Sequence, residues 1–234
     1  MKNKNGSDTR ISKKLRHTIN STNSKNKELQ AELDAMNKPI KVLNLYAGIG
    51  GNRKLWVNVE VTAVEIDPKI AEIYKAFFPQ DKVIVSDAHK YLLEHFQEFD
   101  FIWSSPPCPT HSRLAIANIK AEIRFPDLKL YEEIILLKHR FKGKWVVENV
   151  MSYYEPLIKP KILQRHYFWC NFEIEDKEFP TEKTCTVNDR IRLSKLFGFN
   201  LDKYSGVDKR LLLRNCVLPE LALHIFNNAT RGVK

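Results

Sequence analysis

The sequence predicts an α/β fold, in which helices cover both faces of a largely parallel sheet. Between residues 41 and 149, five short apolar runs alternate with stretches of helical periodicity, a pattern typical of parallel sheets. A glycine-rich turn at 47–51 follows the first run, where sheets of this kind often bind a ligand. Hydrophobic residues make up 43% of the 234 residues, a fraction that is ordinary for a globular chain.

Strands are predicted at 41–46, 61–66, 82–85, 99–104 and 144–149, with a further one at 167–172. A short helical stretch is expected after the glycine turn. Asp67 and Pro68 predict the N-cap and the first residue of a helix that reaches about Phe77. Helical periodicity also predicts helices at 89–96, 127–140, 190–199 and 218–226.

The net charge of +10 is unevenly distributed along the chain. Residues 1–40 hold nine Lys/Arg against four Asp/Glu, and 159–215 hold twelve against eight, whereas 41–158 are balanced. A polyanionic partner, nucleic acid first, is compatible with this distribution. A composition that only favours solubility remains open on charge alone.

The four cysteines show no CxxC spacing, which argues against a zinc site or a disulfide framework. We therefore expect no metal, and a reducing, cytoplasmic setting. No apolar run reaches eighteen residues, and the N-terminus lacks the apolar segment of a secretory signal. No contact with a membrane is expected.

Three features follow successive strands and predict a ligand at the carboxyl edge of the sheet. Gly48, Gly50 and Gly51 allow a tight turn that a ligand can approach closely. Glu65 ends the second strand and could accept bonds from both ribose hydroxyls, while Asp87 could meet an adenine amino group. Each acidic residue could instead be a helix cap or a solvated strand end. The third glycine of a dinucleotide fingerprint is missing, which favours S-adenosylmethionine over NAD.

The segment SSPPCPTHS, residues 104–112, presents Cys108 on a loop stiffened by three prolines. It follows the fourth strand, and Glu148 and Asn149 end the fifth. Adjacent strand ends are neighbours in a parallel sheet, so a thiol and a carboxyl group can converge there. A buried structural cysteine is the alternative.

The motifs NLYAGIGG, VEIDP, SPPCPTHS, VVENV and NCVLP occur in the order found in DNA cytosine-5 methyltransferases. The chain resembles this family over roughly 42–150 and again near 164–226. The resemblance implies a Rossmann-like, S-adenosylmethionine-dependent methyltransferase fold. It implies that Cys108 attacks C6 of a flipped-out cytosine, that Glu148 binds the amino group and N3, and that Asn149 and Arg165 complete the catalytic set.

The same resemblance implies the remaining site residues. The cofactor would contact Tyr46, Ala47, Gly48, Ile49, Gly50, Gly51, Glu65, Ile66, Asp87, Ala88, Pro106, Asn215 and Val217. The nucleic acid would contact Ser112, Arg113, Arg124, Arg190, Arg192, Lys209 and Arg210, within a basic segment that also contains Lys183, Lys195 and Arg214.

The chain departs from the family pattern in several places. Ser104 and Ser105 replace a Gly-Gly pair, Pro109 replaces a glutamine, and Tyr167 stands where a second arginine would follow Arg165. Only residues 173–214 remain for target recognition, so a short site or loose specificity is expected.

The composition of the N-terminus, which is rich in Lys, Asn, Ser and Thr, and the resemblance together divide the chain into four regions. These are a disordered basic tail, 1–37; a catalytic and cofactor-binding domain, 38–172; a small target-recognition region, 173–214; and a C-terminal helix that returns to the catalytic domain, 215–234. We expect a minimal member of phage or bacterial type, a monomer that acts on double-stranded DNA in the cytoplasm of a bacterial cell or a phage-infected host. A tRNA cytosine-5 methyltransferase, an amino-methyltransferase and a catalytically silent nucleic-acid-binding protein remain as alternatives.

Overall fold

The computed structural model describes residues 21–22, 25–27, 29–30, 38–113, 124–179 and 189–231. The chain divides into two compact units, Met1–Pro39 and Ile40–Lys234. The described residues 21–30 of the first unit are helical. Most of the tail predicted to be disordered lies outside the described residues.

Among the described residues of the second unit, seven strands form one sheet in the order β3-β2-β1-β4-β5-β7-β6. Neighbours from β3 to β5 are parallel, whereas β7 runs antiparallel to both β5 and β6. The strands are β1 (Ile40–Leu45), β2 (Val59–Glu65), β3 (Lys82–Val85), β4 (Phe101–Ser104), β5 (Lys144–Val150), β6 (Lys161–Leu163) and β7 (His166–Cys170).

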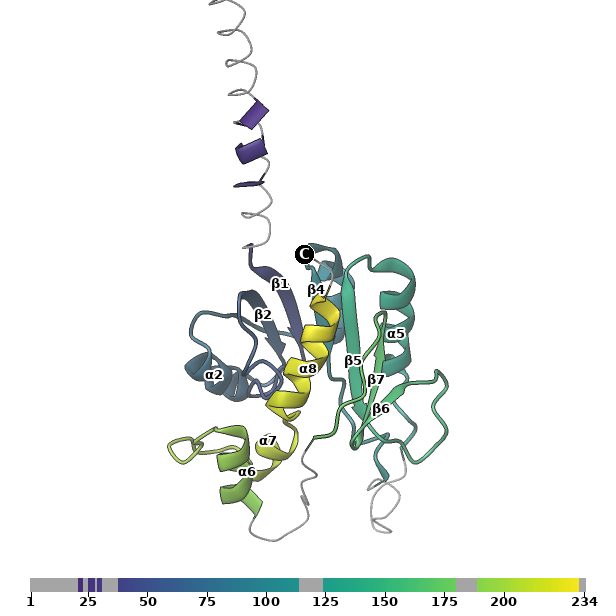
Figure 1. Ribbon diagram of the computed structural model, residues 1–234. Helices are drawn as coiled ribbons and strands as arrows, with labels where there is room; N and C mark the ends of the chain where they lie inside the picture. Colours follow the sequence, from purple (N-terminus) through teal and green to yellow (C-terminus); the bar gives the residue numbers. More distant parts are fainter. Residues whose placement is uncertain are drawn as a thin grey trace, which may run out of the picture. The chain divides into compact units, whose positions relative to one another are not determined.

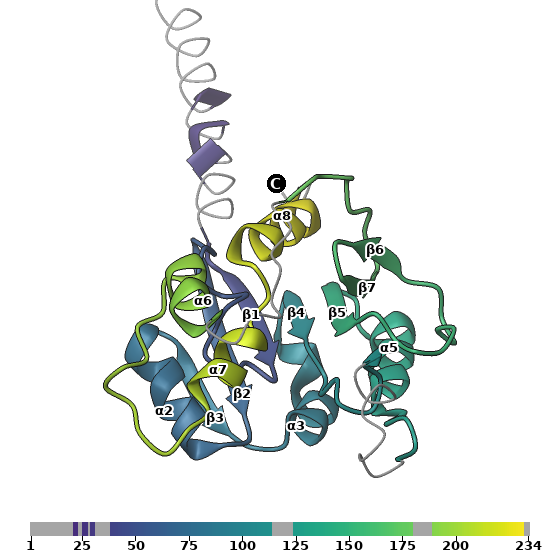
Figure 2. The same ribbon diagram turned by 90° about the horizontal axis from the view of Figure 1, so that it is seen from below.

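Helices cover both faces of this sheet, as predicted (Figures 1 and 2). On one face, α8 (Pro219–Thr230) packs on β1, β4 and β5, beside α2 (Pro68–Phe77). The helices α6 (Asp189–Phe197) and α7 (Lys209–Arg214) share an apolar cluster with α2. On the opposite face lie α3 (Ala88–His95), followed by the short 3₁₀ helix η1 (Phe96–Glu98), and α5 (Lys129–Arg140).

The two apolar faces of the strands explain this arrangement. Val42 of β1 faces the α8 side, while its neighbour Leu43 faces α3 and α5, because successive side chains of a strand point to opposite faces. Phe226 of α8 stacks on Trp56 at 5.2 Å between ring centroids. Burial on both faces makes the strands read as apolar runs, which is why the sequence located them.

The N-cap at Asp67 is confirmed: its side chain accepts from the amides of Lys69 (2.8 Å) and Ile70 (3.3 Å), and α2 begins at Pro68. The short helix expected after the glycine turn is wrong, because the described residues 51–55 form turns. The buried ion pair of Arg53 with Asp81 (2.8 Å) and the bond of Asn52 to Asn44 (2.7 Å) hold this segment instead. Both β6 and α7 were missed, since each is too short to show a period.

The turn after β1 places residues in unusual backbone conformations. Tyr46, Gly48 and Gly50 have φ values of 55°, 54° and 85°, in the left-handed region that side chains rarely adopt. The amide of Ala47 donates to Val64 O (3.0 Å), so the turn is tied to β2. The left-handed residues at 46, 48 and 50 therefore set the path of the glycine loop at the carboxyl edge of the sheet.

In the part of the chain that the structure describes, no helix is both long and apolar enough to cross a membrane. The same residues contain no group of three or more His, Cys, Asp or Glu side chains arranged to hold a metal ion.

Gly48 and Gly50, the two positive-φ glycines of this turn, make a matched test of it. A methyl group at Gly50 would overlap the ring of Phe78, whereas one at Gly48 would meet nothing within 4 Å. We expect Gly48→Ala to lower the free energy of unfolding by about 1–2 kcal/mol, the cost of the left-handed backbone. Gly50→Ala should lower the free energy of unfolding by about 1–3 kcal/mol more than Gly48→Ala does, because the added methyl group overpacks the site. Urea unfolding measures both, and equal losses would contradict the packing argument.

Candidate active site

A pocket of about 190 Å³ opens at the carboxyl edge of the sheet. Its walls come from the ends of β1, β2 and β4, the start of α3 and the start of α5. Of the predicted cofactor contacts, six line it: Tyr46, Glu65, Ile66, Asp87, Ala88 and Pro106. The sequence analysis did not predict the other lining residues, which are Pro107, His89, His111, Asp127, Lys129 and Leu130.

Glu65 fixes the entrance of the glycine loop. One carboxylate oxygen accepts from the Gly48 amide (2.9 Å) and the other from the Asp67 amide (3.0 Å). Each oxygen has a second lone pair, so the side chain can still accept from a ligand. The carboxylate is thus both a structural link and a pocket wall.

Asp87 is the N-cap of α3, which was the alternative considered for it. Its side chain accepts from the amides of His89 (2.9 Å) and Lys90 (3.2 Å). Desolvation alone would raise the pKa of Asp87, but the two amide donors and nearby lysines lower it. The residue is therefore charged, and it also lines the pocket.

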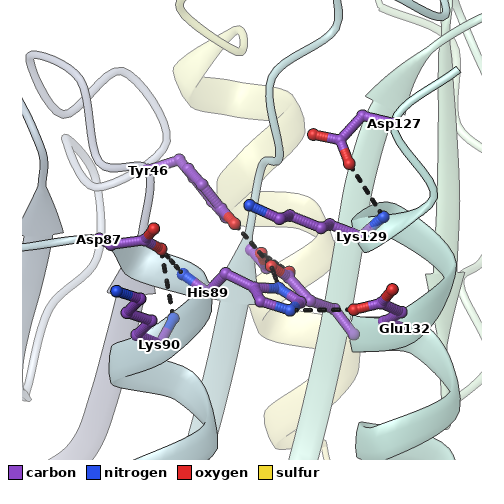
Figure 3. Close-up of polar contacts among 9 residues, drawn as sticks. Tyr46, Asp87, His89, Lys90, Asp127, Lys129 and Glu132 are labelled. Carbon is purple, nitrogen blue, oxygen red and sulfur yellow. Dashed lines mark hydrogen bonds and ion pairs between the residues drawn. The ribbon is translucent and has the colours of Figure 1, made fainter. Parts of the chain in front are cut away.

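A buried carboxylate, Glu133 of α5, lies behind the pocket wall. It accepts from Tyr46 Oη (2.6 Å) and Ser104 Oγ (2.6 Å), and it pairs with His89 Nδ1 (3.1 Å). The hydrogen bond to Glu133 raises the pKa of His89, whose other nitrogen pairs with Glu132 (3.1 Å; Figure 3). This cluster links β1, β4, α3 and α5 around the pocket.

The other predicted cofactor residues lie outside the pocket lining. Ala47, Ile49 and Val217 are buried in the apolar core, and Gly50 faces Phe78. Asn215 is exposed at the end of α7. Gly51 lies against Cys216, since a methyl group added there would come within 2.6 Å of its Cβ. The NCVLP segment thus packs on the glycine loop, although Asn215 does not reach the pocket.

The loop that carries Cys108 is anchored at both ends. The buried side chain of Asn149 donates to Pro106 O (2.9 Å). The amides of His111 (2.9 Å) and Ser112 (3.0 Å) both donate to the carbonyl of Cys108. Burial, followed by the charge of Glu148, raises the pKa of the Cys108 thiol. Asn149 therefore holds the loop, and Cys108 rests as a thiol next to a carboxylate.

The sequence analysis missed His166, which is the residue that contacts Glu148. His166 Nδ1 lies 2.6 Å from Glu148 Oε1. Both side chains point to one face because Glu148 pairs with Phe168 and Val150 pairs with His166 across β5 and β7. Arg165, which was predicted from the family pattern, is exposed at the turn between β6 and β7. The antiparallel register that selects His166 is not visible in the sequence.

The predicted nucleic-acid contacts fall into two groups. Arg113 and Arg124 are exposed at either end of the undescribed segment 114–123, and Ser112 forms an isolated bridge with Ser152. In α6 and α7, Arg190 pairs with Asp202 (2.6 Å) and Arg210 with Asp189 (2.7 Å). Lys209 donates to Asp202 O (2.9 Å), Arg192 lies on α6, and Lys183 is outside the described residues.

The electrostatic coupling of Cys108 to Glu148 can be measured directly. Only the thiolate is alkylated rapidly, so the pH midpoint for iodoacetamide labelling of Cys108 should lie above the ordinary value of about 8.5. Glu148→Gln removes a negative charge that opposes ionisation, so it should lower this midpoint. Peptide-level mass spectrometry separates Cys108 from Cys170 and Cys216, whose pKa values burial also raises. An unchanged midpoint in Glu148→Gln would show that the two groups do not interact.

Comparison with known proteins points to one family. Residues 40–156 match the family described as C-5 cytosine-specific DNA methylase. The human tRNA (cytosine(38)-C(5))-methyltransferase is 32% identical over 162 residues, which are 66% of this chain and 41% of that protein. Its counterpart from Bos taurus is 31% identical over the same fractions. The chain thus spans less than half the length of these curated relatives.

The fold is shared with a solved structure, the Entamoeba histolytica methyltransferase EhMeth. The similarity has a TM-score of 0.56 at 13% identity and covers 84% of this chain and 99% of that chain. At this identity the likeness shows the fold alone, which is the Rossmann-like α/β fold of methyltransferases. With the match over residues 40–156, which include the glycine loop, Cys108 and Glu148, the chain belongs to the C-5 cytosine-specific DNA methylase family.

Proposed function

We propose that the protein transfers a methyl group from S-adenosylmethionine to C5 of cytosine in DNA, with Cys108 as the nucleophile. The observation that carries this proposal is the position of the Cys108 thiol. It lies at the carboxyl edge of the sheet, near the charge of Glu148, and is preceded by two prolines that line the pocket. A nucleophile, a carboxyl group and a cofactor pocket thus meet at one edge.

The pocket residues fit the cofactor in chemical type. Glu65 offers carboxylate oxygens to ribose hydroxyls, and Ile66, which is 67% exposed, offers an apolar surface to adenine. Asp87 can accept from the adenine amino group. His111 adds a buried nitrogen, Nε2, that has no partner among the described residues. When bound, S-adenosylmethionine would supply an electrophilic methyl group.

Cys108 and Glu148 would act on different atoms of the cytosine. Sγ of Cys108 bonds to C6, and its thiol proton leaves to a base or to solvent, while C5 gains the electron density that attacks a methyl group. Glu148 hydrogen-bonds the amino group and N3, where charge develops. Loss of the C5 proton then breaks the Sγ–C6 bond and releases Cys108. The charge of Glu148 opposes ionisation of Cys108, so a Glu148 that has taken up a proton from solvent would favour attack and would also donate that proton to N3 in a hydrogen bond.

The wider expectations belong to the same proposal. The basic region 173–214 would hold phosphates and read few base edges, and a flipped-out base would come from double-stranded DNA. Arg190 and Arg210 pair with acidic side chains. Ser112, Arg113 and Arg124 lie beside the nucleophile loop, so we expect this second group to contact the phosphates nearest the target base. A monomer acting in the cytoplasm of a bacterial cell or a phage-infected host completes the proposal.

A tRNA substrate is the second candidate. The curated relatives at 31–32% identity are named as tRNA cytosine-5 methyltransferases. The chemistry at C5 and C6 would be unchanged, so the catalytic residues alone do not favour one nucleic acid over the other.

The test is cytosine-conversion sequencing of both DNA and RNA from a methylation-free bacterial host that expresses the chain, beside a Cys108→Ala control. We expect methylated cytosines in a shared short context of the DNA, absent from the control. Methylation confined to tRNA would select the second candidate. Identical maps in both strains, together with retained nucleic-acid binding by the pure protein, would support a silent scaffold.

Substitutions at His166 and Arg165 test whether the residue that contacts Glu148 in the structure or the residue implied by the family pattern matters more for catalysis. His166→Ala removes a hydrogen bond to Glu148, so kcat should fall roughly 10- to 100-fold, as expected for a bond to a charged group. The KM for the nucleic acid and the melting temperature should change little. Arg165→Ala, at the exposed turn, should instead raise KM with a smaller effect on kcat. The reverse pattern would favour Arg165, as the family resemblance implied, over His166 as the catalytic residue of this segment.

A further inference from the structure

His111 presents an unsatisfied nitrogen at the pocket. The side chain is 1% exposed and lines the pocket with Pro107, Asp127 and Lys129. Its Nδ1 lies 2.6 Å from Tyr154 Oη, but Nε2 has no hydrogen-bond partner among the described residues. A buried polar atom that is left without a partner destabilises the folded chain. Such an atom beside a ligand pocket requires an explanation.

The hydrogen bonds behind His111 show what Nε2 still lacks. Tyr131 Oη accepts from the Leu157 amide (3.2 Å), and Tyr154 has a side-chain hydrogen bond with Tyr131. Burial lowers the pKa of His111, an effect that Asp127 only partly opposes, so the ring is neutral. If Tyr154 donates to Nδ1, Nε2 carries an unused proton; if Nδ1 donates to Tyr154, Nε2 carries an unused lone pair. Nε2 therefore has one unused hydrogen-bonding site in either tautomer.

The backbone ties His111 to the nucleophile. Its amide donates to the carbonyl of Cys108 (2.9 Å), and its own carbonyl accepts from the Tyr153 amide (3.0 Å). These bonds make the backbone of His111 part of the Cys108 loop, and Tyr154 holds the ring through Nδ1. The charge and the backbone of Asp127 both raise the pKa of His111, but no group among the described residues meets hydrogen-bond geometry at Nε2.

We infer that His111 is a cofactor-binding residue, whose Nε2 forms a hydrogen bond with S-adenosylmethionine and so couples pocket occupancy to the Cys108 loop. This inference rests on the proposed function, because it assumes that cofactor. No other described group supplies the missing partner. The coupling would make the position of the nucleophile depend on a bound cofactor.

Two substitutions at His111 separate binding from structure. In His111→Asn, the side-chain amide can replace Nδ1 and keep the hydrogen bond with Tyr154, but it does not reach the position of Nε2. In His111→Gln, the longer amide reaches that position and loses Tyr154. His139→Asn, on the exposed end of α5, is the matched control. Isothermal titration calorimetry of the full chain with S-adenosylmethionine gives Kd, and thermal melting without ligand gives stability.

We expect His111→Asn to raise Kd about 3- to 10-fold, the loss of one neutral hydrogen bond, with a melting temperature near that of the wild type. His111→Gln should bind within about twofold of the wild type and melt at a lower temperature. Equal binding by His111→Asn and wild type, as when Asp127 or a water completes Nε2, would overturn the inference. So would a greater loss of binding in His111→Gln than in His111→Asn.

A measurement on the unaltered chain provides an independent readout. With ¹⁵N-labelled histidine, the Nε2 resonance of His111 should shift on titration with S-adenosylmethionine, while that of His139 stays fixed. An Nε2 resonance that does not move at saturating ligand would contradict the inference and leave the proposed function intact. Failure of the wild-type chain to bind S-adenosylmethionine at all would instead overturn both.

Discussion

The parallel pairing of β2, β1, β4 and β5 is the constraint on which the site depends, because it brings four strand ends to one edge of the sheet. Glu65 ends β2, Tyr46 follows β1, Cys108 follows β4 and Glu148 lies near the end of β5. The order β2-β1-β4-β5 reverses direction at β1. A crevice forms where the chain leaves β1 and β4 toward opposite faces, and the pocket occupies that crevice.

Polar groups buried at this edge then fix the loops. Glu133 joins Tyr46, Ser104 and His89, and Asn149 holds Pro106. Such bonds are strong in a buried setting when every partner is present. They also explain how Tyr46 is kept at a φ of 55°, since its hydroxyl group is anchored on α5. Rigidity at the pocket thus comes from side chains of α3, α5, β4 and β5, and the loop sequence alone does not supply it.

The parts of this picture that the sequence predicted follow from local patterns. Burial on both faces made β1, β2, β4 and β5 visible as apolar runs, whereas the edge strand β3 showed only as the short run KVIV. Asp67 with Pro68 marked the start of α2. The pairing of Glu148 with His166 depends on the register of β5 and β7, which no local pattern shows, and the family resemblance implied only the neighbouring Arg165 as a catalytic residue. Glu133 lies in the middle of α5 and reads as an ordinary helical glutamate. His111 was quoted within its motif, but its unpaired nitrogen exists only in the folded chain.

The position of α8 has a consequence for how the chain is made. Phe226 stacks on Trp56 and lies edge-on to Phe101 (5.3 Å between centroids). The helix α8 thus covers segments that the ribosome synthesises more than a hundred residues before it. Contacts between such distant segments form late and slowly. During translation one face of the sheet stays open to water, with its tryptophan and phenylalanine rings exposed, until Pro219–Thr230 leaves the ribosome. Production of this protein in the cell should therefore depend on chaperones that shield nascent apolar surfaces.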